Sequence, residues 1–270
     1  MGLKEIIEKS EKPLIKKDII EGLIKLGLKS NDKVMVHSSL SSFGYVVNGA
    51  NDIIEALMEV VHDGIIIMPG HFSVNSNVRE WQNPPVPESW FEKVEQNIMP
   101  ASKVVEPVGV GRIPRVFGRY DGVAHTNHPF VALQVYGKHP KELINQPLNR
   151  PHSISGPFGY MYNHGIKLLM LGSNYDNLTF MHLASNILES YMDMYSNIYQ
   201  DGQVIRVKYE IENDEPEDFI KIGELFEIAY PKSIEIKQIG QAKCRLIEGK
   251  ALIDFTVAYY KKHGIKNRDE

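Results

Sequence analysis

Cysteine is almost absent from this chain of 270 residues, which contains only Cys244. A single cysteine excludes an internal disulfide and a zinc cluster built from cysteines. Its neighbours in GQAKCRLI are largely apolar. We therefore expect a small buried core residue rather than a nucleophile.

An excess of charge of one sign is also lacking, because the formal net charge is −4. Proteins that bind nucleic acid usually carry a basic surface, so no nucleic-acid partner is predicted. No run approaches the roughly 18 apolar residues of a membrane span. The charged N-terminal sequence MGLKEIIEKSEK does not have the pattern of a signal peptide. We expect a cytoplasmic protein with no membrane partner.

Several catalytic motifs are missing as well. Neither GxxxxGK[ST] nor a GxGxxG after a strand occurs, which removes the usual support for nucleoside triphosphate and dinucleotide binding. A GxSxG elbow is absent, which argues against a serine hydrolase. The ten histidines include no HxxxH or HExxH pair, so no metal is predicted.

The sequence does contain an alternation of short apolar runs and amphipathic stretches. Strands are predicted at 33–38, 63–69, 132–136, 166–171, 203–212 and 234–239, and helices at 14–27, 52–62, 217–229 and 248–263. The first strand–helix–strand unit favours parallel pairing, whereas the turn Asp201-Gly202 favours an antiparallel hairpin. We predict an α/β fold: a mixed, largely parallel central sheet with helices on its faces, in three layers and a single domain, 1–270. The long connection 71–107 reads as irregular, and such segments are usually functional or lids.

The stretch 167–187, KLLMLGSNYDNLTFMHLASNI, carries the best candidate base. An apolar strand, a polar loop and a helix follow one another, and ligands bind at such strand ends in α/β sheets. His182 lies early in the helix, where an imidazole is biased toward its neutral, proton-accepting form. Asp176, six residues earlier, is close enough in sequence to fold back on it. The alternative is a capping aspartate and a core histidine.

A second candidate site is VHSSLSSFGYVVNGA, residues 36–50. Small hydroxyl residues and free backbone N–H groups just before a helix form an anion site, which would suit phosphates and pantetheine amides. By itself the pattern is equally compatible with a solvated polar loop.

Taken together, these segments resemble the aminoglycoside 3-N-acetyltransferase family over nearly the whole chain. VHSSLSSFG is similar to the family's coenzyme A loop, and YDNLTFMHLA to the DxNTSLHLAE stretch that carries the catalytic histidine. GRIPRVF resembles its MGxIPExF element, TNHPF its SxHP turn, and GPFGYMY its SPLGxLY segment. The order and spacing of these motifs are more specific than any one of them.

The resemblance implies a coenzyme A-dependent N-acetyltransferase that transfers acetyl directly from acetyl-CoA to a small-molecule amine, with a homodimer as a possible assembly. His182 would be the general base. Its acidic partners would be Asp176 and a glutamate of 203–212, with Glu210 preferred over Glu212. The residues expected to bind the cofactor are His37, Ser38, Ser39, Leu40, Gly44, Gly49, Gly111 and Arg112.

Departures from the family pattern concern the acceptor. Ser185 stands where the family has the glutamate that closes HLAE, a residue that could help to recognise cationic amines. The aminoglycoside is thus one candidate acceptor. The other is a different amino sugar, for example a nucleotide-linked one used in surface-polysaccharide synthesis. A non-catalytic binding protein is a further alternative, which retention of His182 and Asp176 disfavours.

Overall fold

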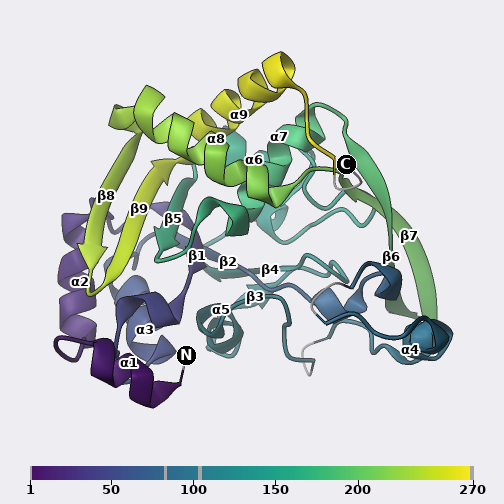
Figure 1. Cartoon of the computed structure of the whole chain (residues 1–270), viewed down its shortest axis with the longest axis horizontal. Coiled ribbons are helices and arrows are strands. Elements are labelled where there is room, and N and C mark those ends of the chain that lie inside the picture. The colour runs from purple at the N-terminus through teal and green to yellow at the C-terminus, as the bar shows by residue number, and fades with distance from the viewer. Residues whose placement is uncertain (1, 82–83, 103–104, 268–270) are drawn as a thin grey trace.

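A seven-stranded sheet organises the computed structural model, which describes residues 2–81, 84–102 and 105–267 (Figure 1). The strand order is β3-β4-β2-β1-β5-β9-β8. The strands are β1 (Lys33–Ser38), β2 (Ile65–Pro69), β3 (Ala124–His125), β4 (Leu133–Gly137), β5 (Lys167–Leu171), β8 (Ile234–Ile239) and β9 (Ala242–Glu248).

The sheet is parallel at its centre and antiparallel at its edges. β1 pairs in parallel with β2 and β5, while the pairs β2–β4, β3–β4, β5–β9 and β8–β9 are antiparallel. β4 and β9 are the strands that run against β1, so five of the seven strands share one direction. The predicted mixed, largely parallel sheet is confirmed. The central strands are continuous apolar runs because both of their faces are covered.

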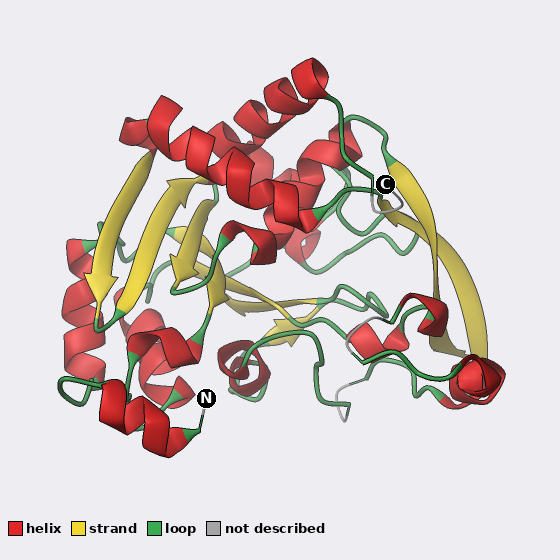
Figure 2. Cartoon of the chain, viewed as in Figure 1, coloured by secondary structure: helices red, strands yellow, loops and turns green. Residues whose placement is uncertain are grey.

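Helices cover both faces, which confirms the three predicted layers (Figures 1 and 2). Val34 and Val36 of β1 point into one core and Met35 into the other, as alternation along a strand requires. The first core is covered by α2 (Lys16–Lys25), α3 (Ala50–Val60) and α5 (Arg112–Phe117), and the second by α6 (Pro157–Asn163), α7 (His182–Ile187), α8 (Pro216–Ala229) and α9 (Gly249–His263). None of the helices in the described ranges is long and apolar enough to cross a membrane.

A separate two-stranded ribbon, β6 (Tyr191–Gln200) and β7 (Gln203–Glu212), stands to the right in Figure 1. Its turn has positive φ at Asp201 (51°) and Gly202 (78°), the conformation that tight hairpins need, and it confirms the predicted hairpin. The 71–107 connection is mostly irregular where it is described, but it also contains α4 (Phe91–Asn97) beside the ribbon. Another helix, α1 (Leu3–Lys9), comes before α2 in the chain.

Candidate active site

His182 is the first residue of α7, and a carboxylate holds its ring. Its Nδ1 lies 2.7 Å from Oδ1 of Asp214, which is fully buried just beyond the end of β7. Nδ1–H is therefore the donor, and the lone pair of Nε2 remains for an incoming proton. The His182 side chain keeps 15% of its surface exposed. The pair has the form of a base whose tautomer is set by a buried acid.

A second histidine–carboxylate pair stacks against the first. His152 and His182 have ring centroids 5.3 Å apart at an angle of 14°. His152 Nδ1 lies 2.5 Å from Oε2 of Glu212, whose other oxygen accepts a hydrogen bond from Asn186 Nδ2 at 2.8 Å. Burial opposes the charge of Glu212, but His152 beside it, with His182 and Asn186, holds the pKa of this carboxyl below its usual range. A buried carboxylate thus lies beside the His182–Asp214 pair.

The structure corrects the predicted acidic partners. Asp176 is exposed and accepts a hydrogen bond from Asn177 Nδ2 at 2.7 Å, so it does not pair with His182. Glu210 is half-exposed and pairs with Arg150 at 2.7 Å. Glu212, the alternative left open by the sequence, lies in the site. Asp214 and His152 were missed, because nothing in their local sequence marks them as partners of a residue 30 or so positions away.

Ser185, on the same helix, is fully buried. The departure from HLAE thus falls at a buried position of α7.

His37 links the site to the end of β1. Its Nε2 accepts a hydrogen bond from the backbone N–H of Thr179 at 3.2 Å, so the ring proton of the neutral form is on Nδ1. Its carbonyl oxygen accepts a hydrogen bond from Ser173 Oγ at 3.0 Å. Burial, with a contribution from His182, lowers the pKa of His37 to about 3. His37 thus stays neutral and ties β1 to the segment that leads into α7.

A cavity of about 650 Å³ lies beside this segment. Seven of the eight residues expected to bind the cofactor line it: Ser38, Ser39, Leu40, Gly44, Gly49, Gly111 and Arg112. The eighth, His37, is buried behind the wall. The loop before α7 supplies further lining residues, among them Asn174 and Asn177. The structure therefore brings the predicted residues together at the carboxyl end of β1, next to the chain that carries His182.

Serine and glycine residues shape this cavity. Ser38 Oγ is buried and has no hydrogen-bond partner among the described residues. Gly44 has φ of 80°, a conformation that side chains disfavour. A Cβ on Gly111 would stand 3.2 Å from the Ser38 carbonyl oxygen, so glycine lets α5 begin close to β1. Arg112 follows it and adds a positive charge to the lining.

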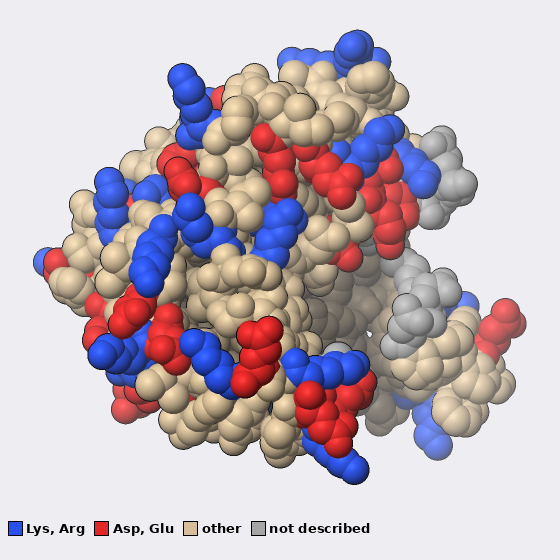
Figure 3. Space-filling view, turned by 60° about the vertical axis from the view of Figure 1, so that its left-hand side comes forward, with Lys and Arg blue, Asp and Glu red and all other residues tan. Residues whose placement is uncertain are grey.

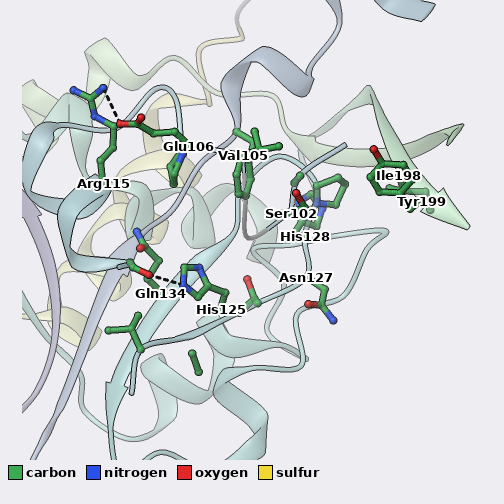
Figure 4. Close-up of a pocket in the computed structure, with 18 of the residues that line it drawn as sticks. Ser102, Val105, Glu106, Arg115, His125, Asn127, His128, Gln134, Ile198 and Tyr199 are labelled. Atoms are coloured by element: carbon green, nitrogen blue, oxygen red, sulfur yellow. Dashed lines mark hydrogen bonds and ion pairs between the residues drawn. The ribbon is translucent and has the colours of Figure 1, made fainter. Parts of the chain in front are cut away.

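A larger cavity, about 870 Å³, lies between α5, β3 and the tip of the ribbon (Figure 4). It is lined partly by the 71–107 connection and by residues 125–129. Glu106 lies between two guanidinium groups, 3.5 Å from Arg115 and 3.3 Å from Arg119. Gln134 also lines the cavity, and its Oε1 is buried without a partner among the described residues. Around Glu106, positive charge therefore exceeds negative charge.

His128 of the HTNHP segment has a structural role. Its Nδ1 accepts hydrogen bonds from the N–H groups of Phe130 and Val131, and Nε2 donates to the Leu148 carbonyl at 3.2 Å. Both ring nitrogens are satisfied, and burial lowers the pKa of His128 to about 3. It holds a turn in its neutral form.

Positive and negative side chains interleave over most of the face shown in Figure 3, and a hollow opens on its right side. Among the described residues, no group of three or more His, Cys, Asp and Glu side chains is arranged to hold a metal ion. The described residues place the His182–Asp214 pair a few positions along the chain from Asn177, which lines the cavity beside Ser38.

Comparison with known proteins places the chain in a family. Residues 35–261 match the family model for aminoglycoside 3-N-acetyltransferase. The chain is 32% identical over 271 residues to the SPbeta prophage-derived aminoglycoside N(3')-acetyltransferase-like protein YokD of Bacillus subtilis, covering 98% of this chain and 99% of that protein. The protein belongs to the aminoglycoside 3-N-acetyltransferase family.

Solved structures agree with this assignment. The crystal structure of YokD has a TM-score of 0.90, with 96% of this chain and 98% of that chain covered at 32% identity. AAC-IIIb with CoASH has a TM-score of 0.80 at 21% identity, covering 93% of this chain and 97% of that one. A mutant of AAC(3)-IVa in complex with a gentamicin has a TM-score of 0.78 at 23% identity, covering 94% of this chain and 91% of that one. The last two likenesses establish the shared fold.

Proposed function

We propose that the protein, as one transferase domain, moves the acetyl group of acetyl-CoA to an amine of a small molecule, with His182 as general base. The observation that carries the proposal is the His182–Asp214 pair at 2.7 Å, which directs the lone pair of Nε2 away from the carboxylate. The cavity of about 650 Å³ that Ser38 lines is called the Ser38 cavity. Residues 172–177 contribute to its wall, and His182 follows them in the chain. His182 thus follows Asn177, a residue of the cavity wall, by five positions.

The base is needed because an amine is protonated near neutral pH and an ammonium has no lone pair for attack. His182 Nε2 accepts the proton, and the imidazolium that forms lies against the buried Asp214, with the anion of Glu212 behind His152. Positioned general bases contribute about 10²–10⁴-fold to rate. The two carboxylates stabilise the charged ring because little water lies between the groups to screen them.

The Ser38 cavity fits coenzyme A by the chemistry of its walls. Ser38 Oγ and the loop N–H groups can bond the pantetheine amides, and Arg112 can pair with a phosphate. When bound, acetyl-CoA supplies an activated acetyl group. AAC-IIIb, which shares this fold, was solved with CoASH.

The direct test is release of free thiol from acetyl-CoA in the presence of a panel of amines. We expect thiol release only when both substrates are present. Changing Ser38 and Ser39 together to Val should raise KM for acetyl-CoA and leave KM for the amine nearly unchanged, because the larger side chains narrow the cavity. Absence of thiol release with every amine, from protein that binds CoA, would instead support a non-catalytic binding protein.

Two acceptors are proposed. An aminoglycoside follows from the family, and AAC(3)-IVa was solved with a gentamicin. A different amino sugar that carries an anionic group, as a nucleotide-linked sugar does, is favoured by the cavity in Figure 4, where Arg115 and Arg119 outnumber Glu106. Specificity constants for gentamicin-type amines and for phosphate-bearing amino sugars separate the two. Arg115→Gln should weaken use of the phosphate-bearing acceptors, with Arg79→Gln, an ion-paired arginine that does not line this cavity, as the control.

A further inference from the structure

The N-terminal helix α1 is a feature that neither the fold nor the proposed chemistry explains. Leu3–Lys9 lies outside residues 35–261, the span that matches the family model. The helix contributes no buried residue to either core. Two of its side chains, Leu3 and Ile6, nevertheless line the Ser38 cavity.

The attachment of α1 holds it over the loop that forms this cavity. Ser10, just after the helix, accepts a hydrogen bond from the Tyr45 N–H at 2.7 Å. Gln241 Nε2 donates to the Lys9 carbonyl at 2.6 Å. Leu14 and Val46 then form a β-bridge. The end of α1 is thus fastened to Tyr45 and to the turn between β8 and β9, and the residues that follow it run beside Val46.

The sequence of α1 is amphipathic in spite of this exposure. Leu3 and Ile6 are spaced three residues apart, which places them together on the side of the helix that lines the cavity. Lys9 pairs with Glu5 at 2.8 Å on the helix surface. Leu3 is 64% exposed and Ile7 49%. A helix of seven residues is not stable in water by itself, so a ligand packed against its apolar side would stabilise it.

The position of α1 identifies which part of the donor it meets. Figure 1 shows α1 at the lower left and α7, which begins with His182, in the upper part of the molecule. The thioester must lie near His182 for transfer, so Leu3 and Ile6 face the opposite, nucleotide end of a bound acyl-CoA. The flat faces of adenine are suited to packing against aliphatic side chains.

We infer that α1 is a strap across the cofactor cavity and that Leu3 and Ile6 select coenzyme A thioesters by packing on their nucleotide end. The inference rests on the proposed function. The strap makes the protein distinguish acetyl-CoA from a donor that ends at pantetheine. It acts on donor binding and leaves the proton transfer at His182 unchanged.

The test compares Leu3→Ser/Ile6→Ser with Ile7→Ser, a matched change on the same helix at a residue that does not line the cavity. Partial burial of two aliphatic side chains corresponds to about tenfold in affinity. We expect the double variant to raise the Kd for CoA and the KM for acetyl-CoA about tenfold. Its kcat, its KM for S-acetylpantetheine and its melting temperature should stay near wild type, because α1 lies outside both cores. Ile7→Ser should match wild type throughout.

Calorimetric titration of CoA separates the outcomes. If wild type binds CoA and the double variant binds it within twofold, the strap is refuted while the proposed function stands. An equal loss with acetyl-CoA and S-acetylpantetheine would also refute it, because the nucleotide end would then not be the part in contact. If wild type binds no CoA, the proposed function itself fails.

Discussion

The two histidine–carboxylate pairs are built alike and exposed differently. In each, Nδ1 bonds a carboxylate from the end of β7 or just beyond it, and the two rings are stacked. The His182 side chain is 15% exposed, whereas that of His152 is 4% exposed. An accessible imidazole can exchange a proton with a reactant, but an enclosed one can only support its neighbours. We therefore assign proton transfer to His182 and a positioning role to His152 with Glu212.

The largest expected effect comes from disrupting the more exposed pair, His182–Asp214. His182→Ala should lower turnover by about 10²–10⁴-fold, the usual contribution of a positioned base, while Kd for CoA stays near wild type. His152→Ala should cost less turnover because its ring does not reach the reactant. Steady-state kinetics with saturating acetyl-CoA measure both. Turnover of the His182 variant within threefold of wild type would remove it as the base.

Disrupting the buried pair, His152–Glu212, should lower the free energy of unfolding. Glu212→Gln leaves His152 buried without its anion, and loss of one partner of a buried ion pair costs about 3–5 kcal/mol in the free energy of unfolding. Glu210→Gln, two residues earlier on the same strand, breaks a half-exposed pair with Arg150 and should cost about 1 kcal/mol or less. Urea unfolding of the two variants checks the difference. Equal losses would mean that burial does not distinguish these glutamates.

Variants of Asp214 and Asp176 test which of the two aspartates supports His182. Asp214→Asn removes the anion that holds His182 and should lower kcat about 10²-fold, because the tautomer is no longer set. Asp176→Asn should leave kcat within threefold, since Asp176 is exposed and bonded to Asn177. The pH dependence of kcat should change only in the Asp214 variant. A larger loss in the Asp176 variant would restore the partner expected from the sequence.

The smallest effect concerns a buried histidine outside both pairs. His128 has a pKa of about 3 in the folded protein against an ordinary value of 6.5. Its contribution to stability is complete above pH 6.5 and is lost as the pH falls from 6.5 toward 3, because the unfolded chain binds the proton first. The loss is about 1.4 kcal/mol per pH unit within that window. The free energy of unfolding at pH 7, 6 and 5 should thus fall less steeply in His128→Gln than in wild type. Parallel slopes would contradict this.

Local sequence was sufficient for much of the fold and for identifying a set of residues that line one cavity. Apolar periods and the Asp201-Gly202 turn located the predicted strands and helices, since these depend on neighbours a few positions apart. The resemblance of the 36–44 segment to the coenzyme A loop was informative for the same reason, because its serines and glycines are contiguous. Seven of the eight expected residues line one cavity.

The acidic partners could not be located in this way. The Tyr175 ring is fully buried and packs against Gly223, where an added Cβ would stand only 2.3 Å from the ring. Because Tyr175 points inward, the adjacent Asp176 is directed to solvent. Asp214 reaches His182 only because the ribbon ends against the start of α7. His152 pairs with a residue 60 positions further on.

By itself, the sequence determined six of the nine strands that the described residues form, the four longest helices, the hairpin turn, the serine loop and the histidine at the start of α7. The tertiary structure alone decided which carboxylate holds that histidine, which glutamate is buried beside it, and that α1 lies over the Ser38 cavity. The physical reason is range: backbone periodicity and turn conformation depend on adjacent residues, whereas an ion pair or a cavity wall depends on how distant segments pack against one another.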